Sequence, residues 1–406
     1  MRSSTRLPGL SLACVLTCLV LGACSSIPRI PATGDFFGQR VATTVDAEVA
    51  RYYLESYAQG RHENRKMDEK ISALYRSHGN SLPSREELKA ISVAFSVDFA
   101  ALFFADRLLN NACNKTLNRL FARYLENDAR VDRNISASYQ ILFVPGWDYV
   151  SNGGLTGADF AKPRELATRA GFENHLVKLP PTGSVEAGAR VLAAEIARHR
   201  RSGKRILLAG TSSAGPAIHL ALGELLDEQE LSSVKVWLNL GGILGGTPLV
   251  DYFEGQPQRM LLDFYAWAKG WDRQAIPSMG TVASRTRFSR LQLNSDIVVI
   301  NYVGIPLSGQ LSQYSGTGYR MLRSDGPNDG LVLLTDVIAP GSLSVVALGS
   351  DHFFAEDPEI DRKTVALMKL VVAYASKDTT IACAETGDTV LRQARQRVPG
   401  ISLFAD

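Results

Sequence analysis

Histidine and cysteine are scarce in this chain, with six and five residues among 406. They are scattered, and no Cys/His cluster has the spacing of metal ligands, so the sequence predicts no metal site. A Gly-x-Gly-x-x-Gly turn of the dinucleotide-binding type is also missing, and we expect no cofactor. Charge of one sign is not in excess, because 44 basic side chains nearly balance 41 acidic ones, for a formal net charge of +3. So weak a field does not favour nucleic acid as a partner.

The apolar run at the N-terminus is short for a membrane span. Arg2 and Arg6 precede residues 7–23, whereas a spanning helix needs about 20 apolar residues, so this segment is predicted to be a cleaved signal peptide. It ends in Leu-Gly-Ala-Cys24, which resembles the lipobox of bacterial lipoproteins. The resemblance implies that Cys24 carries lipid. Ser25 after it implies an outer-membrane anchor in the bacterial cell envelope, facing the periplasm or the surface.

An ordinary secretory signal with an accidental cysteine is the alternative interpretation, and in both cases the protein leaves the cytoplasm. Export is consistent with the cysteine positions. Cys14 and Cys18 lie in the removed segment and Cys24 takes lipid, which leaves Cys113 and Cys383 as a candidate disulfide. Two separate buried thiols are the other reading, because sequence alone does not place their Cα atoms within bonding distance.

The pattern of apolar and polar residues changes several times along the remaining chain. After the signal peptide (1–23), residues 24–42 show no period and are interpreted as a tether. Residues 43–135 place apolar side chains at three- and four-residue spacing, which predicts an N-terminal helical extension. In 136–378, short apolar strands alternate with helical stretches, the pattern of a mostly parallel sheet flanked by helices. Residues 379–406 form a C-terminal tail.

Within the α/β part, amphipathic crossover helices separate the apolar strands. The predicted strands are 139–144, 175–179, 205–209, 234–240, 296–303 and 343–348. The predicted helices are 158–170, 185–200, 214–226 and 360–375. A long aromatic-rich segment, 251–293, lies between two of the predicted strands, 234–240 and 296–303, and is a candidate lid.

The strongest chemical signal is Gly210-Thr-Ser212-Ser213-Ala214-Gly, which directly follows an apolar strand and precedes a helix-forming stretch. A nucleophile on a tight strand-to-helix turn needs small residues two positions before and after it. Ser212 has Gly210 and Ala214 there. Ser213 is the competing nucleophile, but Thr211 in the corresponding position fits a crowded turn poorly. The sequence therefore favours Ser212.

The predicted strand 139–144 is followed by the turn Pro145-Gly146-Trp147. The expected oxyanion hole has two backbone donors, the N–H groups of Trp147 and of Ser213. Pro145 departs from the His-Gly found in many hydrolases at this place, although a backbone donor does not require that side chain.

These motifs resemble α/β-hydrolases of the bacterial lipase and esterase type over about residues 139–376. Asn239-Leu-Gly-Gly and the Gly-Thr-Pro-Leu that begins at Gly246 resemble the segment after the nucleophile helix. Asn-Asp329-Gly-Leu-Val resembles the acid loop. The resemblance implies an α/β-hydrolase fold and assigns the acid to Asp329. Asp325, four residues earlier in the same polar turn, is the rival, and nothing physical in the sequence separates the two.

His352 is the candidate base by elimination among the six histidines. It follows the last predicted strand, and the order nucleophile, acid, base is the one this fold uses. The other histidines lie in the helical extension, in sheet-covering helices or at the opposite edge of the sheet: His62, His78, His175, His199 and His219. Asp351 is adjacent to His352 and would project away from its ring.

Together these features predict a serine hydrolase that cleaves carboxylic esters, small-molecule or lipid, through an acyl-enzyme. An acyltransferase acting on an envelope acceptor uses the same chemistry and stays open. So does a non-catalytic lipoprotein that keeps the fold as a binding module. The sequence gives no indication of the oligomeric state.

Overall fold

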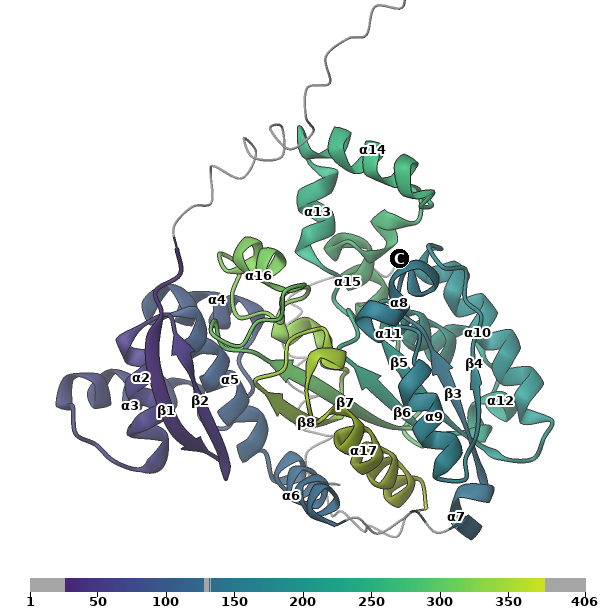
Figure 1. The fold of residues 1–406 in the computed structure, drawn as a ribbon, viewed down its shortest axis with the longest axis horizontal. Coiled ribbons are helices and arrows are strands. Elements are labelled where there is room, and N and C mark those ends of the chain that lie inside the picture. The colour runs from purple at the N-terminus through teal and green to yellow at the C-terminus, as the bar shows by residue number, and fades with distance from the viewer. Residues whose placement is uncertain (1–25, 128–130, 132, 377–406) are drawn as a thin grey trace, which may run out of the picture.

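The computed structural model describes residues 26–127, 131 and 133–376. A six-stranded sheet with the order β4-β3-β5-β6-β7-β8 forms its centre, and every neighbouring pair of strands is parallel. The strands are β3 (Tyr139–Val144), β4 (Glu173–Leu176), β5 (Arg205–Thr211), β6 (Val234–Leu240), β7 (Val298–Ile305) and β8 (Leu343–Leu348). Helices cover both faces (Figure 1). The fold class predicted from the sequence, a mostly parallel sheet flanked by helices, is confirmed.

The helices of the α/β part fall close to the amphipathic stretches of the sequence, and α10 and α17 have the predicted bounds. The helices are α8 (Tyr149–Thr156), α9 (Ala161–Arg169), α10 (Val185–Arg200), α11 (Ala214–Leu220), α12 (Glu228–Ser233), α13 (Pro248–Glu254), α14 (Gln258–Lys269), α15 (Thr281–Arg290), α16 (Gly316–Leu322) and α17 (Ile360–Ala375). Short 3-10 or π turns are η2 (Ala221–Leu225), η3 (Ile276–Met279), η4 (Leu334–Val337) and η5 (Phe354–Glu356).

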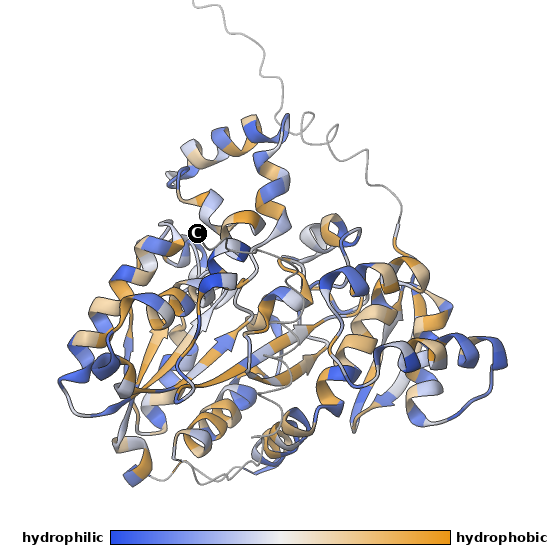
Figure 2. Ribbon diagram, turned by 180° about the vertical axis from the view of Figure 1, so that it is seen from behind, coloured by the Kyte–Doolittle hydropathy of each residue, from blue (hydrophilic) through white to orange (hydrophobic). Residues whose placement is uncertain are grey.

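Alternation along the strands builds two apolar layers. In β5, Ile206 and Leu208 face the layer that includes α10 and α11, whereas Leu207 and Ala209 face the layer formed with α6 (Ala112–Glu126), α9 and α17. Figure 2 shows the apolar residues concentrated on the strands and on the inner sides of the helices. The sheet is therefore buried on both faces.

The N-terminal extension is not purely helical, which corrects the prediction. Residues 24–42, interpreted as a tether, contain β1 (Ile30–Phe36) and the start of β2 (Gln39–Val45), which pair as an antiparallel hairpin. Its buried positions recur every fourth residue on one side of each strand, at Ala32 and Phe36 and at Val41 and Val45. The position between the two buried ones, two residues from each, is Gly34 in β1 and Thr43 in β2, so neither strand shows a regular apolar alternation in the sequence.

Helices follow the hairpin as predicted, and Gly79 ends α3 (Arg65–His78). They are α2 (Glu48–Glu55), α3, α4 (Arg85–Ala94), α5 (Val97–Asn110), α6 and α7 (Arg133–Ala137), with a short turn η1 (Tyr57–Gln59). Aromatic residues of α2 and α5 pack beneath the hairpin, with Tyr53 and Phe99 in edge-to-face contact. The extension thus has its own apolar centre, continuous with one face of the main sheet.

Asp98 ties the extension to the α/β part. It is fully buried at the start of α5 and accepts hydrogen bonds from the Asp46 N–H at 2.7 Å and the Ser308 N–H at 2.9 Å. The hydroxyls of Ser308 and Tyr319 donate to it at 2.6 and 3.0 Å. Because Ser308 and Tyr319 follow β7, one carboxylate satisfies donors from both parts of the chain.

We expect Asp98→Ala to lower the free energy of unfolding by about 3 kcal/mol or more, because each buried donor left without a partner costs roughly 1–3 kcal/mol. Urea denaturation followed by circular dichroism measures this loss. The control is Asp296→Ala, an exposed residue in a loop, which is expected to stay within about 0.5 kcal/mol of wild type. Equal stabilities of the two variants would contradict the role of Asp98.

Candidate active site

Ser212 lies in a sharp turn between β5 and α11. Its φ angle is 54°, in the left-handed region that residues with a side chain rarely adopt. The turn is held on both sides, since the Ser212 N–H donates to Leu240 O at 3.3 Å and the Ser212 carbonyl accepts from the Ile243 N–H at 3.1 Å. This backbone places Ser212 at the carboxyl edge of the sheet, just past the end of β5.

The turn requires small residues where the sequence has them. A Cβ atom at Gly210 would lie 2.2 Å from Ile218 Cδ1, and one at Gly215 would lie 2.7 Å from Gly242 Cα. Ser213, the rival nucleophile, has an ordinary φ of −62° in the position before α11. Of the two serines, Ser212 is the one with the strained backbone.

His352 follows β8 and is hydrogen-bonded to Asp329. The distance from His352 Nδ1 to Asp329 Oδ2 is 2.8 Å, and the His352 N–H also donates to the Asp329 carbonyl at 2.9 Å. The other carboxylate oxygen accepts from the backbone N–H groups of Leu331 and Val332, both at 2.9 Å. A carboxylate at Nδ1 assigns the ring proton to that nitrogen and leaves Nε2 without a proton in the neutral ring.

Asp329 and Asp325, which the sequence did not distinguish, occupy different environments. The Asp329 side chain is 1% exposed beside His352. Asp325 is 39% exposed and forms an ion pair with Lys89 on α4 at 3.0 Å. The structure therefore brings Asp329 together with His352 and keeps Asp325 in a surface contact with the extension.

Two opposing effects act on the pKa of His352. Burial lowers this pKa, but the charge and hydrogen bond of Asp329 and the charge of Asp351 outweigh burial and raise it above the ordinary histidine value. The sequence does not favour Asp351 as the acid, because it is adjacent to His352. Its carboxylate instead accepts from the Ser312 N–H at 2.6 Å and the Phe353 N–H at 2.9 Å, and it also contacts the Ser315 hydroxyl. Asp351 thereby holds the histidine loop against the loop after β7.

The turn after β3 packs directly on Ser212. A Cβ atom at Gly146 would lie 3.4 Å from the Cβ of Ser212. The backbone N–H groups of both neighbours of Trp147 have acceptors. The Gly146 N–H donates to the Ala158 carbonyl at 3.3 Å, and the Asp148 N–H donates to the Pro181 carbonyl at 2.6 Å. Among the described residues the Trp147 N–H has no such acceptor, so it is available to a ligand beside Ser212.

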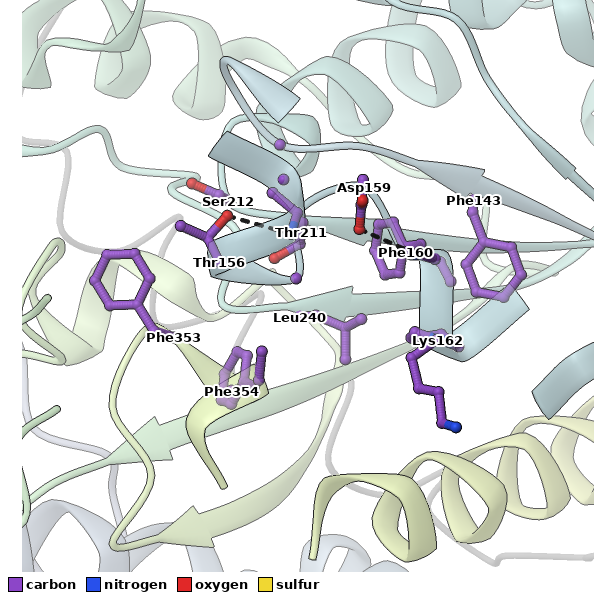
Figure 3. Close-up of a pocket in the computed structure, with 18 of the residues that line it drawn as sticks. Phe143, Thr156, Asp159, Phe160, Lys162, Thr211, Ser212, Leu240, Phe353 and Phe354 are labelled. Carbon is purple, nitrogen blue, oxygen red and sulfur yellow. Dashed lines mark hydrogen bonds between the residues drawn. The ribbon is translucent and has the colours of Figure 1, made fainter. Parts of the chain in front are cut away.

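Ser212, Trp147 and His352 line one cavity of about 830 Å³. Figure 3 shows Ser212 and Thr211 at one end of it, with Phe353 and Phe354 close by and Phe143, Phe160 and Lys162 toward the other end. The backbone at residues 240–241 contacts both the histidine and the nucleophile. A Cβ atom at Gly241 would lie 3.6 Å from His352 Cε1, and the carbonyl of Leu240 accepts the Ser212 N–H. A volume of this size is typical of a small-molecule site.

The candidate lid, 251–293, folds into α13, α14, η3 and α15. Trp271 in this segment donates its Nε1–H to Asp148 Oδ2 at 3.1 Å, and its ring lies edge-on to Trp147 with centroids 4.6 Å apart. The sequence does not predict these contacts with the turn beside Ser212. The only feature that points to them is the abundance of aromatic residues in the segment. Motion of the segment stays a prediction.

Several predicted sites fall outside the described residues. The signal peptide and Cys24 lie there, as does Cys383 in the C-terminal tail. Cys113 is buried near the start of α6 and is disulfide-bonded. Its pairing with Cys383 remains a prediction.

No protein-family model and no curated protein matches the chain. Solved structures show similarity at the level of the fold. A metagenomic carboxyl esterase, MGS0156, has a TM-score of 0.49 and 18% identity over 60% of this chain and 77% of its own. The mature lipase BlEst2 of Bacillus licheniformis has a TM-score of 0.45 and 19% identity over 57% and 91%. Lipase 1 of Pelosinus fermentans has a TM-score of 0.42 and 16% identity over 60% and 99%. Similarity this low does not assign an activity.

Two features are absent from the part of the chain that the structure describes. Within 26–127, 131 and 133–376, no helix is long and apolar enough to cross a bilayer. The same residues contain no group of three or more His, Cys, Asp or Glu side chains arranged to hold a metal ion.

Replacing Asp351 by Asn is expected to lower the pKa of His352, because it removes a negative charge that stabilises the imidazolium while keeping one acceptor oxygen. The titration midpoint of the ring then moves to lower pH. NMR of the imidazole signals across the pH range measures it. Asp325→Asn, which removes a carboxylate that faces Lys89 instead, serves as the matched control and should leave the midpoint in place. An unchanged midpoint in Asp351→Asn would contradict the electrostatic role.

Proposed function

We propose that this chain is a serine hydrolase that cleaves carboxylic esters through an acyl-enzyme, with Ser212 as nucleophile, His352 as base and Asp329 as acid. One observation carries the proposal. His352 Nε2 is buried and has no hydrogen-bond partner among the described residues, while Nδ1 is held by Asp329. A buried polar atom without a partner is costly, and it supports a functional role where the residue also lines a cavity. Here that atom belongs to a residue that lines the same cavity as the strained Ser212.

The proposed reaction starts when Ser212 Oγ attacks the ester carbonyl carbon. An Oγ–C bond forms, the hydroxyl proton moves to His352 Nε2, and the carbonyl electron pair moves onto its oxygen. The N–H groups of Trp147 and Ser213 stabilise that oxyanion, while Asp329 stabilises the imidazolium. When the tetrahedral intermediate collapses, the bond to the alcohol oxygen breaks, and the alcohol leaves with the proton from Nε2.

Water then repeats the sequence on the acyl-enzyme. It gives one proton to His352 Nε2 and adds its hydroxyl to the acyl carbon. The Oγ–C bond breaks as Ser212 takes the proton back, and the carboxylic acid leaves. No further reactant is needed, because each proton taken by the imidazole is returned within the same half-reaction.

Ser212→Ala is expected to lower the hydrolysis of p-nitrophenyl butyrate by at least about 10³-fold, since the nucleophile is removed while the oxyanion donors remain. Covalent labelling by a fluorophosphonate should be lost in parallel. The matched control is Ser213→Ala, which keeps the backbone donor and is expected to keep the labelling. Folded wild-type protein that neither labels nor hydrolyses any ester would instead support a non-catalytic binding module.

We also propose that the body is tethered to the outer membrane by lipid on Cys24. The residues between Cys24 and Ile30 span at most ~20 Å, so the hairpin would stay close to the bilayer. Support comes from α14, which exposes Met260, Phe264 and Trp267 along one side at 72%, 51% and 78%. In Figure 1 this helix projects at the upper end of the molecule, the side on which β1 begins.

Metabolic labelling with a palmitate analogue tests the tether. Wild type is expected to incorporate the label and to sediment with membranes, because an acylated cysteine partitions into the bilayer. Cys24→Ser should lose both. Cys18→Ser, within the predicted signal peptide, is the matched control and should keep both. Unlabelled wild-type protein in the soluble fraction would leave the ordinary secretory signal as the interpretation.

A further inference from the structure

The cavity at Ser212 continues far along one face of the sheet. Its sheet wall has three levels, set by the strand register. Thr211, Leu240 and Tyr302 form the upper level; Phe143, Ala209 and Leu238 form the middle one; Ile141 and Leu207 form the floor. From Thr211 to Leu207 the wall descends ~13 Å along β5, at about 3.3 Å per residue.

Helix α17 forms the opposite wall. The lining residues Ile360, Thr364, Leu367, Met368 and Val371 lie on one side of this helix, at spacings of three and four residues. From Ile360 to Val371 the helix covers ~16 Å, which matches the depth on the sheet side. Lys162 and Asp361 are 3.6 Å apart, and this ion pair joins the starts of α9 and α17, which both line the cavity.

The cavity shows that this apolar layer is not completely filled, because it reaches Leu207 and Leu238 on the sheet and Met368 and Val371 on α17. Protein interiors are normally close-packed, so an apolar slot between a sheet and its covering helix calls for an occupant.

We propose that this slot is the acyl-chain site, and that the preferred substrates are esters of long aliphatic acids. The inference rests on the proposed function, because it places the ester carbonyl at Ser212. Ile141, Leu207, Met368 and Val371 give the deep part an apolar surface, which favours methylene groups over polar ones. A chain that enters beside Ser212 would lie between β5 and α17, whose lining residues extend ~13 Å and ~16 Å along the cavity. Met368, beside the floor, sets the chain length that fits.

The test is the ratio of kcat/KM for p-nitrophenyl dodecanoate to that for p-nitrophenyl butyrate. Met368→Trp fills the slot, and the ratio is expected to fall at least ~10-fold. Met368→Ala lengthens the free space and is expected to raise the ratio. Val93→Trp, at an exposed position on α4, is the control for the bulky substitution and should keep the wild-type ratio. A folded Met368→Trp variant with the wild-type ratio overturns the proposal.

Binding of decanoate and of butanoate to Ser212→Ala, measured by calorimetry below micellar concentrations, separates this inference from the proposed function. Tighter binding of decanoate than of butanoate, weakened by the added Met368→Trp change, supports the acyl site even if wild type hydrolyses no ester. Hydrolysis by wild type together with equal binding of the two acids overturns the acyl site and leaves the proposed chemistry standing.

Discussion

The left-handed backbone of Ser212 is the constraint from which the rest of the site follows. A side chain at φ 54° is strained, so the surrounding chain must hold the turn in place. It does so through Leu240 and Ile243 on the adjoining strand and loop. Close packing of α11 on the end of β5 leaves no room for a Cβ atom at Gly210, and close approach of that loop to α11 leaves none at Gly215. The glycines near the site are thus consequences of one turn.

The loop after β8 is organised in a similar way around Asp329 and Asp351. One carboxylate orients the imidazole, and the other fixes the loop by accepting N–H groups from the loops after β7 and after β8. Both acids are buried, so their charges act on His352 through a medium that screens them weakly. The raised pKa of His352 and the rigid position of its ring therefore have the same origin.

How far the sequence predicted this structure depended on the length and regularity of each pattern. Amphipathic helices α10 and α17 were predicted at their observed bounds because a 16-residue apolar stripe has few alternative readings. The hairpin β1–β2 was missed because each strand contributes only two buried residues among Pro, Gly and Thr. Asp325 and Asp329 share one polar turn, and what separates them is burial produced by the fold.

The slot beside α17 lies beyond sequence reasoning for a related physical reason. Alternation assigns Leu207 and Leu208 equally well to a buried position, but only Leu207 packs in the layer with α17 that contains the cavity. The difference arises from how far a helix stands from the sheet, and composition does not encode that distance. β5 carries both the slot wall and, at its end, Ser212. A chain bound against Ala209 and Leu207 is therefore positioned relative to the nucleophile by one continuous rigid strand, which is the kind of preorganisation that fixes a reacting carbonyl.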